Sequence, residues 1–438
     1  MMNNEMKFTL SSVLTKDVKW ASGKESYIER VINKAIDYET YAFLSSKIKT
    51  VDVSDRFVDV IKTFKVRKGI TPAGFKIEFN IEEDSILRID LVRDISYDEN
   101  GVKRPTNVIF SADSANPYEI EPIKNLIGNL TCNPGIIYDL FINNPKANID
   151  GKFKTRDQVM EEIGRILGPG CDISVELNNP YDDIESLLKE AAHFKKMLSE
   201  YRLVIKVPHT GPMDKESINQ LLVGDKTFAN QYNQGKTEDF LRGHNLALRL
   251  QQEGYRINFT LMFEPYQTAL ALQAKPYFIN SFVRHRLIQS NYIIGLLGAY
   301  QTSQNAIFLT QLKEYLIKND HLPLSKKDLD LLAVKDIAEN MIKYRMFEDE
   351  GADGLDGVRH NLRVLKQCNL PDTRLIICSM EGPNNYPDLD RLLTEDEFSE
   401  MTGRVVITAE PNYLAQFTST NQVVSYQRRF MNAANGQK

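Results

Sequence analysis

The chain has 438 residues, of which 42% are apolar and 26% are charged. Its 54 lysine and arginine residues and 59 acidic residues give a net charge of −5, which argues against nucleic acid or an anionic membrane as the main partner, because both require a basic surplus. The length allows two or three domains, or one enlarged α/β barrel with a large core. Small molecules therefore remain possible as substrates, and an anionic substrate would need a local pocket of basic residues.

The cysteines and the apolar segments bear on the cellular compartment. The four cysteines lie far apart in the sequence, without the spacing of zinc-binding pairs, and are expected to be reduced. The first twenty residues have no apolar segment typical of a signal peptide. The longest apolar stretch, around residues 292–300, is too short to span a bilayer. These features predict a soluble, cytoplasmic protein.

Residues 1–105 differ in texture from the rest and are predicted to form an α+β extension. A helical stretch is expected over roughly residues 24–47, and two alternating runs at 76–81 and 86–93 predict a β-hairpin. The polar residues 94–107 are typical of a linker. No chemistry can be assigned to this extension, which could be a cap, an oligomer contact or a regulatory module.

From about residue 107, short apolar runs alternate with amphipathic helical segments, among them 181–200 and 238–253. Eight such runs can be counted: 107–113, 127–131, 172–177, 203–208, 257–263, 277–283, 374–379 and 405–410. Runs that are apolar on both faces and are each followed by a helix indicate a parallel sheet, and eight strands close a (β/α)8 TIM barrel. An open doubly wound sheet is the alternative, but no GxGxxG follows any run. We therefore predict a barrel over residues 106–420 and a tail over 421–438.

One lysine stands out inside these runs. In LVIKVP, Lys206 shares a face with Val204 and should point into the barrel among branched side chains. A buried ammonium without a partner is costly, and its pKa falls as it loses water. A lysine with such a depressed pKa is the reagent for Schiff-base chemistry on a carbonyl. The alternative is a lysine that pairs with a neighbouring acid for structure alone.

Polar residues in other runs offer companions for this lysine. They are two carboxylates, two amides and a hydroxyl: Asp113, Glu176, Asn133, Asn258 and Thr260. Because polar residues at the C-terminal ends of barrel strands converge on one site, we expect them to lie together. The lysine could form an imine, the carboxylates could move protons, and the amides and hydroxyl could hold sugar hydroxyls and a water. Each residue taken singly could instead be a satisfied polar group of the core.

At these residues the sequence resembles the transaldolase family of class I, Schiff-base-forming aldolases. Six segments are similar to family motifs and occur in the family's order: VIFSADSAN, NLTCNPGII, ISVELN, VIKVPHT, INFTLMF and INSFVRHR. The last runs, RLIICS and VVITAEPNYL, are compatible with the closing strands. The resemblance covers about residues 107–420 and implies a divergent, enlarged member of that family.

The resemblance implies a role for each matched residue. Lys206 would attack a ketose carbonyl, with Glu176 and a water held by Thr260 as acid and base. Asp113 would take the proton from the hydroxyl whose carbon–carbon bond breaks. The remaining matched or neighbouring positions would bind substrate: Asn133, Thr131, Asn258, Asn280, Phe282, Arg284, Arg286 and Ser379.

The implied activity is the transfer of a dihydroxyacetone unit from a ketose or ketose phosphate to an aldose acceptor, as in the pentose phosphate pathway. No cofactor besides the covalent Schiff base on Lys206 and no metal is implied, since the six histidines show no ligand spacing. The partner would be a sugar or sugar phosphate, with no nucleic acid and no membrane, and a homo-oligomer is left open. The alternatives are an aldolase that releases free dihydroxyacetone and a catalytically silent barrel that acts as a binding or scaffold protein. Glu176 favours transfer, because the aldolase branch usually has a glutamine there.

Several positions depart from the family's pattern. Glu381 stands where a phosphate-binding arginine is expected, and a carboxylate there would repel a sugar phosphate. Asn280 replaces a serine, and the second phosphate-binding arginine is matched by His285 or, with a shift, by Arg284 or Arg286. The lysine chemistry is therefore expected to be intact, whereas the grip on a phosphate is in doubt.

Two insertions enlarge the predicted barrel. A polar loop around residues 224–235 follows the lysine run, and a long helical insertion over roughly 289–354 follows the sixth run.

Overall fold

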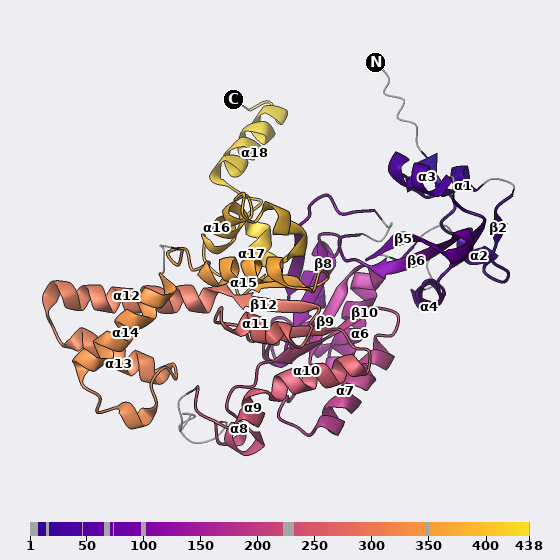
Figure 1. Cartoon of the computed structure of the whole chain (residues 1–438). Helices are drawn as coiled ribbons and strands as arrows, with labels where there is room; N and C mark the ends of the chain where they lie inside the picture. The colour runs from indigo at the N-terminus through magenta and orange to yellow at the C-terminus, as the bar shows by residue number, and fades with distance from the viewer. Residues whose placement is uncertain are drawn as a thin grey trace.

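The computed structural model describes residues 8–14, 17–45, 47–64, 71–72, 74–97, 102–221, 232–346 and 350–437. Within these ranges the chain forms a closed barrel, with an N-terminal module on one side and a helical arm protruding on the other (Figure 1). None of the helices in these ranges combines the length and the apolar character needed to cross a membrane.

Eight parallel strands close the barrel, and they follow one another around it in chain order. Their bounds are β7 Ile109–Asp113, β8 Ile127–Cys132, β9 Asp172–Glu176, β10 Arg202–Pro208, β11 Ile257–Thr260, β12 Phe278–Phe282, β13 Arg374–Cys378 and β14 Val405–Ala409. Each of the eight predicted runs overlaps one of these strands, so the predicted (β/α)8 barrel is confirmed.

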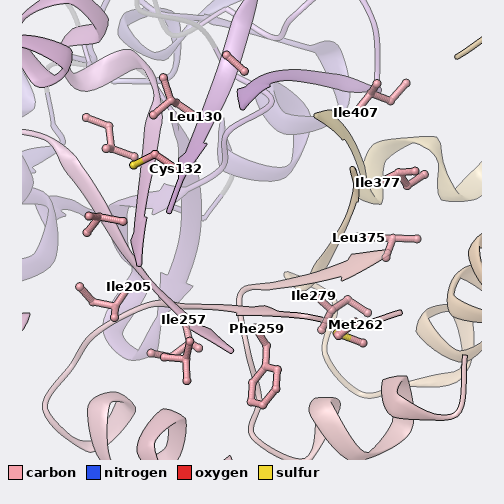
Figure 2. Close-up of a cluster of buried hydrophobic side chains, with 14 of the residues drawn as sticks. Leu130, Cys132, Ile205, Ile257, Phe259, Met262, Ile279, Leu375, Ile377 and Ile407 are labelled. Atoms are coloured by element: carbon pink, nitrogen blue, oxygen red, sulfur yellow. The ribbon is translucent and has the colours of Figure 1, made fainter. Parts of the chain in front are cut away.

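Successive residues of each strand point alternately to the surrounding helices and to the barrel interior. The outward residues are apolar and form the main core with the helices; Figure 2 shows Phe259, Leu375 and Ile377 pointing away from the ring of strands. Fully burying a side chain of this kind contributes roughly 1.5–3 kcal/mol. The inward residues differ between the two ends of the barrel. A small apolar cluster that includes Val204 and Ile376 fills the lower part, toward the N-terminal ends of the strands, and polar side chains lie above it, toward the C-terminal ends.

Helices cover the barrel between its strands. They include α5 Pro117–Ile120, the π-helical turn η3 Ile136–Ile142, α6 Arg156–Leu167, α7 Ile184–Met197, α8 Lys215–Leu221, α9 Thr237–Phe240, α10 Arg242–Gln252, α11 Gln267–Leu272, α15 Asp356–Gln367, α16 Asn385–Leu392 and α17 Pro411–Gln416. The start of α7 illustrates the local cause, since the Asp183 side chain accepts a hydrogen bond from the Ser186 amide and caps the helix. The predicted helices at 181–200 and 238–253 are found as α7 and as the pair α9 and α10.

The N-terminal module contains a four-stranded sheet in the order β2, β4, β6, β5. Its bounds are β2 Lys19–Trp20, β4 Thr50–Val53, β5 Phe75–Glu82 and β6 Ile86–Arg93, with the helices α1 Leu10–Val13, α2 Glu25–Ile28, α3 Tyr38–Ser45 and α4 Asp55–Phe64. Strands β5 and β6 pair antiparallel from Phe75 with Arg93 to Glu82 with Ile86, which confirms the predicted hairpin.

The single helix predicted over residues 24–47 is wrong, because a strand interrupts it. Residues Ala35–Ile36 form β3 and pair antiparallel with β1, Phe8–Thr9. The Thr40 amide then donates to Asp37 Oδ1 at 2.6 Å, so the aspartate starts a new helix. The pairing partner of β3 lies about 27 residues away in sequence, which local helical spacing does not reveal.

The predicted linker at 94–107 is wrong for its first part, which packs into the barrel. Ile95 is fully buried in the apolar cluster of the barrel interior, and Asp94 pairs with Arg374 at 2.9 Å. The preceding Arg93 contacts Asp172, the first residue of β9. Residues 98–101 lie outside the described part of the chain. The N-terminal module thus closes the barrel at the end where its strands begin.

The helical insertion predicted over 289–354 is present as an arm. It consists of α12 Val283–Ser303, α13 Ile307–Lys318 and α14 Leu331–Arg345, which pack around a core of their own that includes Ile293, Leu312 and Val334. The predicted polar loop at 224–235 lies mostly outside the described residues. Helix α18, Asn421–Ala434, occupies the predicted tail, has no buried residue and projects from the barrel in Figure 1.

Candidate active site

Lys206 lies inside the barrel beside a carboxylate. Strand alternation in β10 turns Val204 and Lys206 to the interior, and 6% of the lysine side chain is exposed. Lys206 pairs in register with Glu176 of β9 on one side and with Asn258 of β11 on the other. Its Nζ atom lies 3.3 Å from Glu176 Oε2. The structure therefore brings together three of the residues that the sequence predicted.

The charge state of this lysine differs from the prediction. Burial lowers the pKa of Lys206, but the negative charges of Glu176 and Asp113 outweigh burial and raise the pKa above its ordinary value. The predicted depression is therefore wrong for the free protein, because it treated burial without the carboxylates on neighbouring strands. Burial also raises the pKa of Glu176, although the charge of Lys206 opposes this. The pair consequently holds an ammonium beside a carboxylate that binds protons more readily than an exposed one.

A second carboxylate, Asp113, ends β7. Thr131 lies opposite it in register on β8, and its hydroxyl donates to Asp113 Oδ1 at 2.9 Å. Thr131 is 3% exposed, so its hydroxyl is fixed and orients the carboxylate. The negative charge of Asp113 contributes to the raised pKa of Lys206.

Amide and hydroxyl groups from β11 and β12 complete the interior. Asn280 Nδ2 donates to Asn258 Oδ1 at 2.5 Å and to the Phe259 carbonyl at 2.9 Å, so it fixes the orientation of Asn258. Asn258 Nδ2 and Thr260 Oγ1 are buried and find no hydrogen-bond partner among the described residues. Because leaving a buried polar group unpaired is costly, these two atoms are suited to bind a hydroxyl of a substrate or a water.

Three further predicted residues lie at the C-terminal edge of the barrel. Asn133 Oδ1 accepts a hydrogen bond at 2.9 Å from the amide of Ile136, the first residue of η3, so this oxygen already has a backbone partner. Phe282 packs on Phe263, with 4.6 Å between the ring centroids. Ser379 follows β13 with a φ of 59°, and its carbonyl accepts from the Arg284 amide at 3.0 Å.

The two predicted arginines have different surroundings. Arg286 is buried and bound by Asp356, with Nη2 and Oδ2 2.6 Å apart, and by Glu264. Its guanidinium therefore serves an ion-pair network that also includes Arg345. Arg284 is partly exposed, and its Nη1 lies 3.2 Å from Glu381 Oε2. The structure thus leaves Arg284 at the mouth of the barrel, with a carboxylate as its partner.

Several interior residues escaped the sequence analysis. Cys378 ends β13, its thiol donates to Asn280 Oδ1 at 3.7 Å, and burial raises its pKa, so it stays protonated. Asn129 Nδ2 donates to Ser111 Oγ at 2.8 Å, one layer below Thr131 and Asp113. For Asn129 and Ser111 the available signal was the period of two along a strand, since they stand two positions before Thr131 and Asp113.

Metal ligation has no visible basis in the described part of the chain. There, no group of three or more histidine, cysteine or acidic side chains is placed to hold a metal ion. The buried groups around Lys206 are one ammonium, two carboxylates and neutral amides and hydroxyls, a set suited to proton transfer and imine chemistry.

Solved structures and curated proteins show little similarity to this chain. Two solved structures have low similarity: an aldose reductase from Schistosoma japonicum (16% identity, 42% of this chain, 60% of that chain, TM-score 0.26) and an aldo-keto reductase from Bombyx mori in complex with NADP (10%, 48%, 59%, TM-score 0.24). This chain therefore spans about three fifths of their length, and the TM-scores are too low to indicate a shared fold. No curated protein matches the sequence.

A family match is informative where the structures are not. Residues 110–292 match the family described as transaldolase/fructose-6-phosphate aldolase. The matched segment includes β8 to β12 and most of β7, and therefore contains Asp113, Glu176 and Lys206. This match covers less than half of the chain and supports a divergent, enlarged member of the transaldolase family.

Proposed function

We propose that the protein is a transaldolase-type transferase that moves a dihydroxyacetone unit from a ketose to an aldose through a Schiff base on Lys206. The observation that carries this proposal is the Lys206 ammonium inside the barrel, 3.3 Å from Glu176. Burying two such ions costs several kcal/mol each, and apolar residues of similar volume would often be as stable or more so. A pair kept at this cost favours a chemical role when its cation is a lysine, whose proton can move to the adjacent carboxylate and leave a nucleophilic amine.

The first step is imine formation. Glu176 takes a proton from the Lys206 ammonium, and the neutral amine attacks the carbonyl carbon of the ketose. The carbonyl oxygen is protonated and leaves as water, which yields an iminium ion on Lys206. The Thr260 hydroxyl, which is buried and unpartnered among the described residues, supports a water that carries protons in this step.

The second step breaks the carbon–carbon bond. Asp113, oriented by Thr131, accepts the proton of the substrate hydroxyl next to that bond, and the bonding electrons move into the iminium. An aldehyde leaves, and the dihydroxyacetone unit stays on Lys206 as an enamine. A second aldehyde then adds in the reverse sense, and hydrolysis of the new imine releases the product. Asn258 Nδ2 would hold a hydroxyl of the unit between the two half-reactions, and its burial without a partner among the described residues supports this role.

The charges at the barrel mouth bear on the sugar's far end. Arg284 already faces Glu381, and Arg286 is enclosed by Asp356 and Glu264. A phosphate at this edge would have to compete with a carboxylate for Arg284. We therefore expect sugars without a phosphate to react at rates comparable to those of phosphorylated ones.

A kinetic assay tests the proposed transfer. Purified protein is incubated with fructose or fructose 6-phosphate, with and without an added aldehyde such as erythrose 4-phosphate or glyceraldehyde, and ketose consumption is followed. Transfer predicts consumption that requires the acceptor. Consumption without acceptor, with release of free dihydroxyacetone, would establish the aldolase instead. No consumption of any tested ketose under either condition would contradict both enzymes.

A further inference from the structure

A cavity of about 390 Å³ lies at the end of the barrel opposite the catalytic side chains. Its walls come from the end of α10 and from the segments where β11, β12 and β13 begin: residues 251, 254–257, 275–277 and 369–373. Lys206 lies near the other end of its strand, so the cavity is separate from the proposed active site. Its volume falls within the range typical of sites for small molecules.

Two cations line this cavity, Arg256 and Lys275, and Asp372 is the one acidic residue among its described lining residues. Neither cation forms an ion pair within the described ranges, and the buried Nη1 atom of Arg256 has no hydrogen-bond partner there. Lys275 is exposed. The cavity wall therefore carries a positive excess in a chain whose net charge is −5.

Three arginine side chains surround the ring of Tyr277, which lines the cavity. The guanidinium carbons of Arg93, Arg256 and Arg374 lie 5.5, 5.0 and 6.0 Å from its centroid. Arg93 contacts Asp172, and Arg374 pairs with Asp94, whereas Arg256 lacks such a carboxylate among the described residues. Burial lowers the pKa of Arg256, and the charges of Arg374 and Arg56 lower it further against the opposing Tyr277 and Asp372. A bound anion would relieve this repulsion.

We propose that this cavity binds a small phosphate-bearing molecule, with Arg256 and Lys275 as its charge partners. A phosphate carries close to two negative charges at neutral pH and accepts several hydrogen bonds, which matches two cations opposed by one carboxylate. The planar guanidinium offers paired donors, and the ammonium adds a mobile point charge from the rim. The remaining volume and the Tyr255 and Tyr277 rings leave room for an organic group beside the phosphate.

Side-chain contacts connect this cavity to the N-terminal module. Arg374 and Arg93 connect the Tyr277 ring to Asp94 and to β6, the strand through which the module closes the barrel. A ligand that binds the folded state alone stabilises it in proportion to the logarithm of its concentration above Kd. Binding should therefore raise the unfolding temperature of the whole chain, independently of turnover at Lys206.

Calorimetric titration tests the proposal with inorganic phosphate and with glycerol 3-phosphate, and glycerol serves as the uncharged probe. Measurements at constant ionic strength use the wild-type protein, Arg256→Gln, Lys275→Gln and the control Arg249→Gln. Arg249 is a partly exposed residue of α10 that pairs with Glu253 at 3.1 Å. Loss of a hydrogen bond to a charged group costs about 1.5–3 kcal/mol, so each cavity variant should weaken binding by about tenfold or more. The control should bind like the wild type.

The outcomes separate the alternatives. Saturable binding of a phosphate probe that both cavity substitutions weaken, with a matching loss of the ligand-induced rise in unfolding temperature, supports the site. Binding of inorganic phosphate alone would assign the site to the free anion, and stronger binding of glycerol 3-phosphate to an organic phosphate. Absence of saturable binding would overturn the proposal, as would binding that neither substitution changes or that Arg249→Gln weakens equally. Lys275 is exposed, so Lys275→Gln remains informative even if Arg256→Gln fails to fold.

Discussion

Two acid–base pairs lie on the same two barrel strands, β9 and β10, and we assign a structural role to one and a catalytic role to the other. At the start of β9 and β10, Asp172 Oδ1 lies 3.4 Å from Arg202 Nε, and both side chains are 0% exposed. Near the end of the same strands, Glu176 lies 3.3 Å from Lys206, and the side chains are 13% and 6% exposed. The lower pair is enclosed by the N-terminal module through Arg93, whereas Lys206 of the upper pair lies in register beside Asn258, whose amide is neutral.

The chemical difference between the two cations explains the division. Burial lowers the pKa of Arg202 only to about 10, so the guanidinium stays charged at neutral pH and its pair is structural. An ammonium is a compact charge whose proton can move to a neighbouring carboxylate, and its amine then becomes a nucleophile. The two pairs have similar distances, but the Asp172–Arg202 pair stabilises the barrel, whereas the Glu176–Lys206 pair can supply a nucleophilic amine.

Removal of the amine should have the largest effect. Lys206→Met is expected to abolish detectable turnover and to retain the fold, since methionine fills most of the same space and Glu176, whose pKa burial raises, can take up a proton once the ammonium is gone. Steady-state rates and circular dichroism check the two parts together. Lys189→Met, at an exposed position on α7, serves as the control and should keep wild-type activity. Measurable transfer by Lys206→Met would show that the reaction does not depend on the Lys206 amine.

Glu176→Gln should lower kcat by about 10²–10⁴, the usual range for a lost general acid–base group. Stability should fall less than for the lower pair, because a buried lysine can lose its proton when the carboxylate is removed, whereas an arginine cannot. The pH dependence should also shift. The charge of Glu176 raises the pKa of Lys206, so its removal should lower the pH at which imine formation is half-maximal. Borohydride-trapped adduct measured against pH in both proteins tests the sign, and a shift to higher pH would contradict it.

The lower pair should show the reverse behaviour. Asp172→Asn leaves Arg93 and Arg202 without their shared carboxylate and should lower the free energy of unfolding by about 3–5 kcal/mol, as measured by denaturant titration. The folded fraction should keep its activity. Asp157→Asn removes an exposed partner of His193 and should cost about 0–1 kcal/mol. Equal costs for the two variants would show that the N-terminal closure is not held by this charge.

The smallest expected effect concerns the barrel mouth. Glu381→Ala frees Arg284 from its carboxylate and should raise the ratio of kcat/KM for phosphorylated over plain ketoses by about three- to tenfold, equivalent to roughly 0.6–1.4 kcal/mol. The rate with plain sugars should stay within about twofold. An unchanged ratio would show that this edge does not contact the phosphate end of the substrate.

The sequence was sufficient for the barrel and for the position of Lys206 inside it. The eight apolar runs predicted the strands, and the inward position of Lys206 followed from the period of two. The direction of its pKa did not follow, because it depends on the register that sets Glu176 beside it. The capture of Arg286 by Asp356 joins residues 70 positions apart, and the burial of Ile95 places a polar-looking segment inside the barrel. Such contacts depend on tertiary packing and leave no local pattern.

Reductive trapping on Lys206 tests the central claim most directly. The protein is incubated with dihydroxyacetone or fructose 6-phosphate, reduced with borohydride and digested, and the adduct is mapped by mass spectrometry. The account predicts one adduct per chain, on Lys206, that requires both ketose and reductant. Absence of an adduct with every ketose tested, or an adduct on surface lysines with Lys206 unmodified, would contradict the Schiff-base mechanism.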